Sequence, residues 1–111
     1  SERDPLDGSS THLIIVNRQR AAIGVGRMHF NGIREAQIRY MAIVTGKQRK
    51  GLGSKLLLAL EQRARELGAA RMVLDARETA LRFYHKHGYR AVEPGHTLFN
   101  SVTHVKMEKD L

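Results

Sequence analysis

The sequence predicts an α+β domain whose mixed, mostly antiparallel sheet carries one βαβ crossover. Three short apolar segments, rich in β-branched residues, fill the first half of the chain and are separated by polar turns. From residue 52 the apolar spacing changes to the helical period, and it returns to a strand pattern at residue 71. The expected order of elements is therefore β-β-β-α-β-α-β-β. A chain of 111 residues has room for a single domain with one core.

The first half is expected to form strands over residues 13–16, 21–30 and 37–44. Residues 1–10 are polar and contain Pro5 and Gly8, so we expect a flexible lead-in to the single domain of residues 1–111. Gly24 and Gly26 in the second strand indicate a bulge or a close backbone approach. Asn31-Gly32 is typical of a tight turn, which makes the second and third strands a hairpin.

The second half begins with an amphipathic helix. Its apolar face is formed by Leu52, Leu56, Leu57, Leu60, Ala64 and Leu67. Glu61 faces Arg65 one turn later, and Gly68 stands where a left-handed residue ends a helix. A buried strand over 71–74, a short helix around residues 80–84 ending at Gly88, and strands over 89–92 and 102–107 complete the domain. A turn at Pro94-Gly95 and a loop separate the last two strands.

Composition restricts the partners. The net charge of +8 favours a polyanionic ligand. Nucleic acid is disfavoured because aromatic residues make up only 5% of the chain and the basic residues are not interleaved with them. The absence of cysteine excludes a thiol nucleophile and suits a reducing compartment. No apolar run is long enough to span a bilayer, so we expect a cytoplasmic protein without a membrane partner.

The segment that carries chemistry joins the third strand to the long helix. Gly51 and Gly53 let backbone amides approach a ligand, and the helix start presents unpaired N–H groups and the positive end of its dipole. Gln48, Arg49 and Lys50 add hydrogen-bond donors and positive charge, while Ser54 is expected to cap the helix or contact a phosphate. This pattern predicts an anion site, although a glycine-rich helix start with solvated lysines explains a lone Gly-x-Gly equally well.

Two nucleotide-binding motifs do not fit. A P-loop requires Lys-Ser/Thr after its second glycine, but Leu52-Gly53 follows Gly51. A dinucleotide fingerprint requires a third glycine, which Gly51-Leu52-Gly53 and Gly24-Val25-Gly26 both lack.

The pattern Gln48-x-x-Gly51-x-Gly53 between a strand and a helix resembles the acetyl-CoA signature Gln/Arg-x-x-Gly-x-Gly/Ala of the GNAT acetyltransferases. The resemblance continues in the next helix, where residues 80–89 are similar to the family pattern Ala-x-x-Phe-Tyr-x-x-x-Gly-Phe. Residues 1–4 and 38–43 further resemble a bacterial subgroup of that family. Together the motifs imply the acyl-CoA N-acyltransferase fold and acetyl-CoA as cosubstrate, with no metal.

The resemblance also implies site residues. The backbone of the third strand would hydrogen-bond the pantetheine arm, and the loop would hold the pyrophosphate. The residues implied in cofactor binding are Met41, Ala42, Ile43, Gln48, Arg49, Lys50, Gly51, Leu52, Gly53 and Ser54. Tyr84 matches the tyrosine that often acts as the general acid and protonates the departing thiolate of CoA. The alternative for Tyr84 is an aromatic residue packed in the core beside Phe83.

Three features depart from the family pattern. The usual catalytic glutamate falls at Gln37, which cannot accept a proton, and the other candidates, Glu35, His29 and Glu78, are expected to be surface groups. Arg77 stands where the family usually has asparagine. His85 and His87 are two residues apart on a helix and point to different faces, so no metal site is expected.

The length differs as well. The family normally places a strand and one or two helices before the position of Leu13, whereas only twelve residues precede it here. We therefore expect that N-terminal elements are missing from this chain, and that an under-covered sheet face favours a homodimer. The leading hypothesis is an N-acetyltransferase acting on a small-molecule or peptide amine. A non-catalytic acyl-CoA-binding or regulatory module is the alternative, and a small basic nucleic-acid-binding protein is a distant third.

Overall fold

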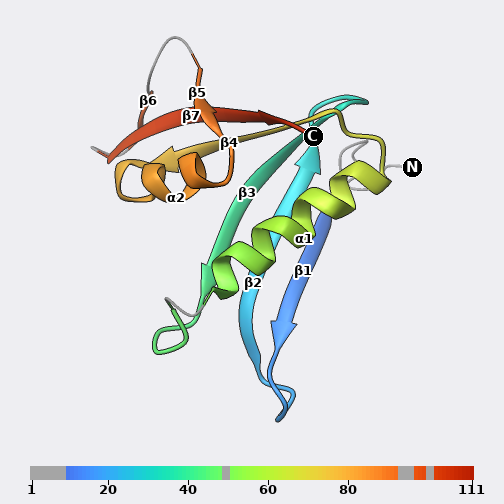
Figure 1. The fold of residues 1–111 in the computed structure, drawn as a ribbon, viewed down its shortest axis with the longest axis vertical. Helices are drawn as coiled ribbons and strands as arrows, with labels where there is room; N and C mark the ends of the chain where they lie inside the picture. The colour runs from blue at the N-terminus through green and yellow to red at the C-terminus, as the bar shows by residue number, and fades with distance from the viewer. Residues whose placement is uncertain (1–9, 49–50, 93–96, 100–101) are drawn as a thin grey trace.

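A computed structural model describes residues 10–48, 51–92, 97–99 and 102–111, and its centre is a seven-stranded mixed sheet (Figure 1). The strands are β1 (Thr11–Val16), β2 (Ala22–Phe30), β3 (Glu35–Ile43), β4 (Arg71–Arg77), β5 (Arg90–Ala91), β6 (Thr97–Phe99) and β7 (Val102–Asp110). They lie in the order β1-β2-β3-β4-β7-β5, with β6 paired to β7. Among the strands of the described residues, β3 and β4 are the one parallel pair, and they are joined by the crossover through α1 (Leu52–Glu66). The predicted α+β class is confirmed.

The C-terminal strands differ most from expectation. β4 and β7 pair continuously from Arg71↔Asp110 to Arg77↔His104, so both strands extend beyond their apolar runs. Backbone pairing across the ladder maintains the extended conformation there, and local hydrophobicity does not reveal it. β6 lies within the segment expected to be a loop, and the expected turn at Pro94-Gly95 lies outside the described residues.

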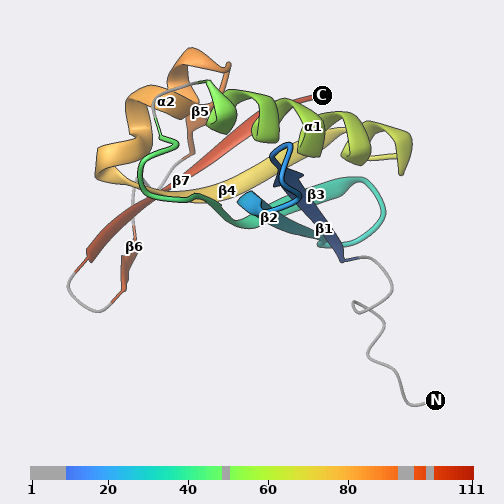
Figure 2. The same cartoon turned by 90° about the horizontal axis from the view of Figure 1, so that it is seen from below.

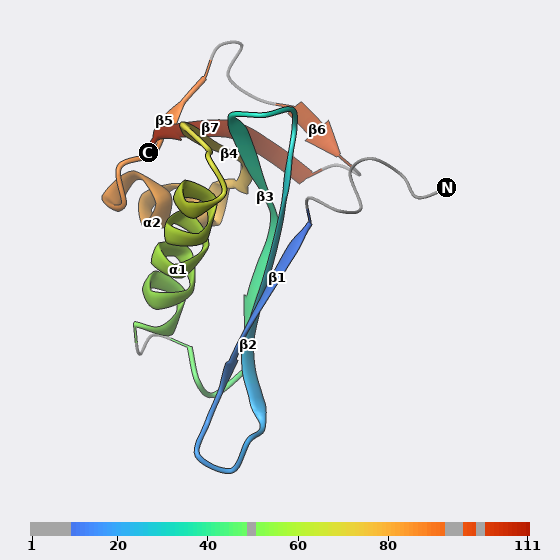
Figure 3. The same cartoon turned by 90° about the vertical axis from the view of Figure 1, so that its right-hand side faces the viewer.

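The helix α1 packs along β1, β2 and β3 (Figures 1 and 3). The predicted apolar face is confirmed at Leu56, Leu57, Leu60 and Ala64, all of which are buried. A Cβ at Gly26 would lie 3.0 Å from Leu60 Cδ1, so the predicted close approach at this glycine is confirmed. The prediction for Leu67 is wrong: its side chain is 44% exposed, because α1 ends there and Gly68 turns the chain with φ +99°.

The second helical segment consists of the 3₁₀ turn η2 (Glu78–Ala80) and α2 (Leu81–Lys86). α1 and α2 lie on the same side of the sheet (Figure 2). On the opposite face, the side chains of Ile14, Val16 and Tyr40 are exposed, and none of the described helices covers them. No helix in these ranges is long and apolar enough to cross a membrane.

A buried polar cluster ties α1 to the end of the chain. The Glu61 carboxylate is fully buried, and it accepts hydrogen bonds from Tyr89 Oη at 2.8 Å and Lys109 Nζ at 2.9 Å. The expected partner Arg65 lies 4.0 Å away and is the weakest of the three contacts. Glu61 lies one turn from Leu57 and Ala64 on the buried side of α1, so its charge is an internal link between layers of the fold.

Candidate functional site

A cleft opens where β3 and β4 separate. The two strands are paired only from Glu35↔Arg71 to Ile38↔Leu74, and beyond this point they run apart (Figure 1). The β2–β3 register shifts at the same place, from Met28↔Ile38 to Arg27↔Tyr40, which leaves Arg39 as an extra residue on β3. A bulge bends the strand that carries it and ends regular pairing, so this bulge accounts for the opening.

The backbone of β3 forms one wall of the cleft. The Val44 amide donates to the Ile23 carbonyl, which fixes the alternation of hydrogen bonds between β2 and β3. In that alternation the N–H and C=O groups of Ala42 point to β2, whereas those of Met41 and Ile43 point to the open side. The Ile43 carbonyl indeed accepts a hydrogen bond from Gln48 Nε2 at 3.0 Å, outside the β2 ladder. Of the three residues expected to bind pantetheine, Met41 and Ile43 have the suitable geometry.

The cleft encloses a cavity of about 730 Å³. Its lining combines β3, the loop after β3, the end of β4, η2, α2 and the start of β7. The lining residues are Arg39, Tyr40, Met41, Gln48, Asp75, Ala76, Arg77, Thr79, Ala80, Tyr84 and His104. The cavity is therefore large enough for an elongated small ligand and mainly polar at its rim.

The first turn of α1 has the features of an anion site. Gly51 precedes the helix with φ +80°, and a Cβ there would meet no atom within 4 Å. The amides of Leu52, Gly53 and Ser54 occupy the first three helical positions, where N–H groups have no partner within the helix. No acidic residue occupies this turn, so nothing in the helix neutralises the positive end of its dipole.

The predictions for the residues between β3 and the first turn of α1 differ in how they compare with the structure. Of the two roles expected for Ser54, capping of the helix is wrong, because Gly51 is the N-cap and no side chain caps it, whereas contact with a phosphate stays a prediction. Ser54 instead lies inside the first turn, where its amide and hydroxyl accompany the free N–H groups. The Gln48 side chain joins the loop to the end of β3 through its bond to Ile43. Arg49 and Lys50 lie outside the described residues.

Tyr84 projects from α2 and lines the cleft cavity opposite β3. Its ring contacts Phe83 edge-on, with 5.1 Å between centroids, and Tyr89 edge-on at 5.7 Å. Burial raises the pKa of the Tyr84 phenol above its usual value, so the phenol keeps its proton at neutral pH. Tyr84 therefore packs against the core and also lines the cavity, and its role as a general acid stays a prediction.

The four residues weighed as a base lie in different surroundings. Gln37 accepts a hydrogen bond from Asn31 Nδ2 at 2.7 Å, and Glu35 pairs with Arg71 at 3.2 Å. His29 Nδ1 lies 3.3 Å from the carbonyl of Phe30, and Glu78 is exposed on η2. None of these four side chains lines the cleft cavity.

The cleft contains polar residues that sequence reasoning missed. Asp75 and His104 line it from neighbouring antiparallel strands, and Arg39 lines it from the bulge. The sequence does contain a signal for Asp75, because this carboxylate interrupts the apolar run of residues 72–76. His104 had no such signal, since only the β4–β7 pairing brings it to the cleft.

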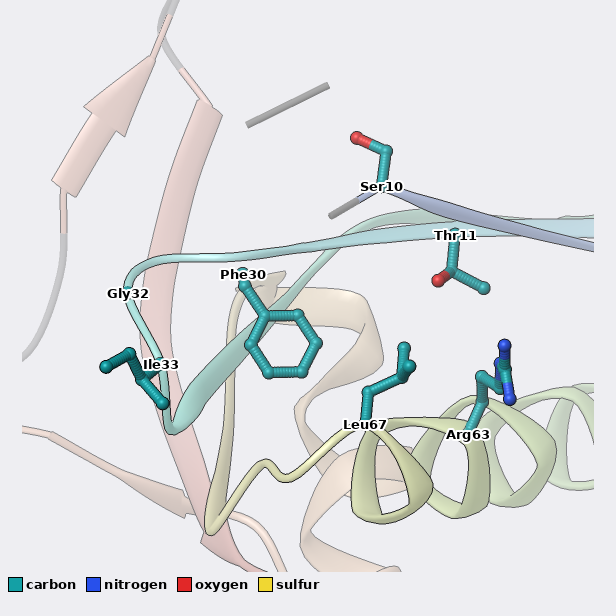
Figure 4. A pocket seen from close by; sticks show the side chains of 7 residues that line it. All are labelled: Ser10, Thr11, Phe30, Gly32, Ile33, Arg63 and Leu67. Atoms are coloured by element: carbon teal, nitrogen blue, oxygen red, sulfur yellow. The ribbon is translucent and has the colours of Figure 1, made fainter. Parts of the chain in front are cut away.

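A second cavity of about 350 Å³ lies at the other end of α1 (Figure 4). Its lining residues are Ser10, Thr11, Phe30, Gly32, Ile33, Arg63 and Leu67. They come from the start of β1, the β2–β3 turn and the C-terminal end of α1. The cavity is thus separate from the cleft and from the free amides of the first turn.

Comparison with known proteins identifies the family. Residues 2–111 match the model of the acetyltransferase (GNAT) domain. The chain is 28% identical over 109 residues to the uncharacterized N-acetyltransferase YjcF of Bacillus subtilis, covering 98% of this chain and 76% of that protein.

Solved structures agree with this match. An acetyltransferase from Bacillus cereus superposes with a TM-score of 0.81 at 26% identity, covering 92% of this chain and 73% of that one. A GNAT family acetyltransferase from Elizabethkingia anophelis with acetyl-CoA bound has the same fold, with a TM-score of 0.79 at 16% identity and coverage of 96% and 79%. The signature loop, the divided β3–β4 pair and the family match together show that the chain belongs to the GNAT acetyltransferase family.

Proposed function

We propose that this chain is an N-acetyltransferase that transfers an acetyl group from acetyl-CoA to an amine acceptor by direct attack. The observation that carries the proposal is the cleft between β3 and β4, which has free backbone groups on one wall and Tyr84 on the other. The free amides of the α1 first turn lie beyond the same loop, at the end of β3. This arrangement suits a ligand with an amide-bearing arm and a pyrophosphate.

In this proposal the pantetheine arm lies along β3 and hydrogen-bonds the backbone of Met41 and Ile43. The pyrophosphate accepts hydrogen bonds from the amides of Leu52, Gly53 and Ser54, where the helix dipole favours negative charge. The net charge of +8 adds a long-range attraction for the polyanionic cofactor. Related folds were solved with acetyl-CoA or CoA bound, which supports a CoA-type cosubstrate.

The chemistry then requires no covalent enzyme intermediate. The amine nitrogen attacks the thioester carbonyl, the new C–N bond forms, and the C–S bond breaks to release the thiolate of CoA. The cleft supplies orientation, and backbone N–H groups of β3 stabilise the developing oxyanion. Tyr84 donates its proton to the departing sulfur. Because burial raises the Tyr84 pKa, the phenol is a weak acid, and we expect its contribution at the low end of general acid catalysis.

The test has two stages. Calorimetric titration with acetyl-CoA should show saturable binding, and its absence at millimolar ligand would exclude both catalysis and the alternative of an acyl-CoA-binding module. Thiol release across a panel of primary amines should then show turnover, whereas binding without any turnover would favour the non-catalytic module.

The role of Tyr84 is tested by Tyr84→Phe. This variant keeps the ring and its packing, so acetyl-CoA affinity should be unchanged while kcat falls roughly 100-fold. Unchanged kcat would remove Tyr84 from the mechanism without affecting the rest of the proposal.

A further inference from the structure

The cleft passes through the sheet to the face without helices. A smaller cavity of about 250 Å³, lined by Gln37, Ile38, Arg39, Asp75 and His104, shares Arg39, Asp75 and His104 with the cleft cavity. Along β4, Leu74 and Ala76 are buried in the core beneath the helices, so the exposed Asp75 between them points to the opposite face. Tyr84 lines the cleft cavity from α2, and α2 lies with α1 on the other face of the sheet (Figure 2). The two mouths of the cleft are thus marked by two different ionisable groups.

Asp75 is the only acidic residue among the described residues that line either cavity. Arg39, Arg77 and His104 line the cleft cavity with it, and Lys106 lies opposite it in the β4–β7 register. No hydrogen bond or ion pair joins its carboxylate to another residue of the described part of the chain.

The other carboxylates of the described residues are engaged, except Glu78, which is exposed on η2 outside both cavities. Those with a basic partner within 4.0 Å are Glu35, Glu61, Glu66, Glu108 and Asp110. In a chain of net charge +8, an unengaged carboxylate at the mouth of a cavity is a ready site for a cation.

We propose that the acceptor amine enters from the helix-free face, and that Asp75 binds its ammonium group and accepts a proton from it. The inference rests on the proposed acetyltransferase function and assigns the proton acceptor that Gln37 cannot supply. It also assigns the substrate class: alkyl amines that are cationic at neutral pH.

The protons balance. The ammonium group gives one proton to Asp75, and the neutral nitrogen attacks the thioester from the side opposite Tyr84. As the C–S bond breaks, Tyr84 protonates the thiolate, and the second proton lost by the nitrogen restores Tyr84. Asp75 returns its proton to water, so one ammonium ion and one thioester become one amide, one thiol and one released proton.

Asp75→Asn tests the proposal with benzylamine and aniline as matched acceptors. Benzylamine is cationic at neutral pH and aniline is neutral, although both carry a primary amino group and a phenyl ring. We expect kcat/KM for benzylamine to fall roughly 100-fold and that for aniline to change by less than about threefold. Glu78→Gln is the control: it makes the same change of charge at an exposed residue outside both cavities, and it should leave both acceptors unaffected. Equal losses for the two acceptors, or no loss for benzylamine, would overturn the proposal.

Binding provides a readout that does not need turnover. In the CoA-loaded protein, titration with benzylammonium chloride should shift the amide NMR signals around Asp75 and His104 saturably. The dissociation constant should rise at least about tenfold in Asp75→Asn. The absence of saturable shifts in the wild-type protein would refute the ammonium site even if acetyl-CoA binds. Failure of acetyl-CoA to bind would instead refute the proposed function.

Discussion

The buried Glu61 offers the sharpest test of what stabilises this fold. Glu61→Gln keeps the shape of the side chain but removes its charge and replaces one carboxylate oxygen with an NH₂ group. Tyr89 Oη and Lys109 Nζ both donate to the carboxylate, at 2.8 and 2.9 Å, so one of the two donors loses its acceptor. Their common partner is fully buried, and water cannot replace it there without rearrangement.

The size of the effect follows from burial. A hydrogen bond to a charged group contributes about 1.5–3 kcal/mol, and removing one partner of a buried ion pair costs about 3–5 kcal/mol. The Lys109 side chain is 20% exposed, so its ammonium group can turn to solvent when the pair is broken. Because solvent can then hydrate the Lys109 ammonium group, we expect Glu61→Gln to lower the free energy of unfolding by about 2–3 kcal/mol, within the range of those two effects.

Glu66→Gln on the same helix is the matched control. Glu66 pairs with Arg63 at 3.1 Å, nearly the distance of the Glu61–Lys109 pair, but both side chains are 49% exposed. Solvent screens such a pair, and its loss should cost at most about 0.5–1 kcal/mol. The two substitutions therefore make the same chemical change and differ mainly in burial.

Urea unfolding followed by circular dichroism measures both variants. The midpoint should decrease clearly for Glu61→Gln at an unchanged m-value, and only slightly for Glu66→Gln. A double-mutant cycle with Tyr89→Phe should give a coupling energy of about 1 kcal/mol or more, since the two side chains share a hydrogen bond. Equal losses for the two glutamates, within about 0.5 kcal/mol, would show that burial does not control the strength of this cluster.

Two further predictions concern backbone conformation and pH. Gly51 has φ +80°, so Gly51→Ala should destabilise the protein by about 1–2 kcal/mol in urea unfolding. Gly53→Ala places a Cβ at 3.6 Å from the Phe83 ring and improves helix propensity, so it should stabilise the protein by up to about 1 kcal/mol. If Gly53→Ala were instead less stable than Gly51→Ala, the argument from backbone strain at Gly51 would be contradicted. Burial and the charge of Glu61 raise the pKa of Tyr89, so the stability that this residue contributes is complete below about pH 10 and is lost as pH rises beyond it. The unfolding free energy should fall above that pH, and it should fall less steeply in Tyr89→Phe. The same dependence on pH in both proteins would refute the claim that Tyr89 causes it.

The site was predictable from sequence where its parts are local. The glycine spacing at Gly51 and Gly53 and the start of a helical period at Leu52 are contained within a few residues, and so are the unpaired amides of the helix start. The same holds for Gly68, whose left-handed conformation follows from its place after a helix. Tyr84 was identified through a motif of ten residues, and the structure places it on the cleft.

Long-range pairing decided the rest. Glu61 meets Tyr89 and Lys109 across 28 and 48 residues of chain, and its neighbour in sequence, Arg65, does not indicate these partners. Likewise, Asp75 becomes a site residue only because a bulge at Arg39 bends β3 away from β4. The sequence by itself determined most of the elements and the glycine turn that begins α1, since backbone propensities and hydrophobic period act over a few residues. The cleft and its charged partners required the tertiary structure, because strand register and the packing of α1 on the sheet choose which distant side chains meet.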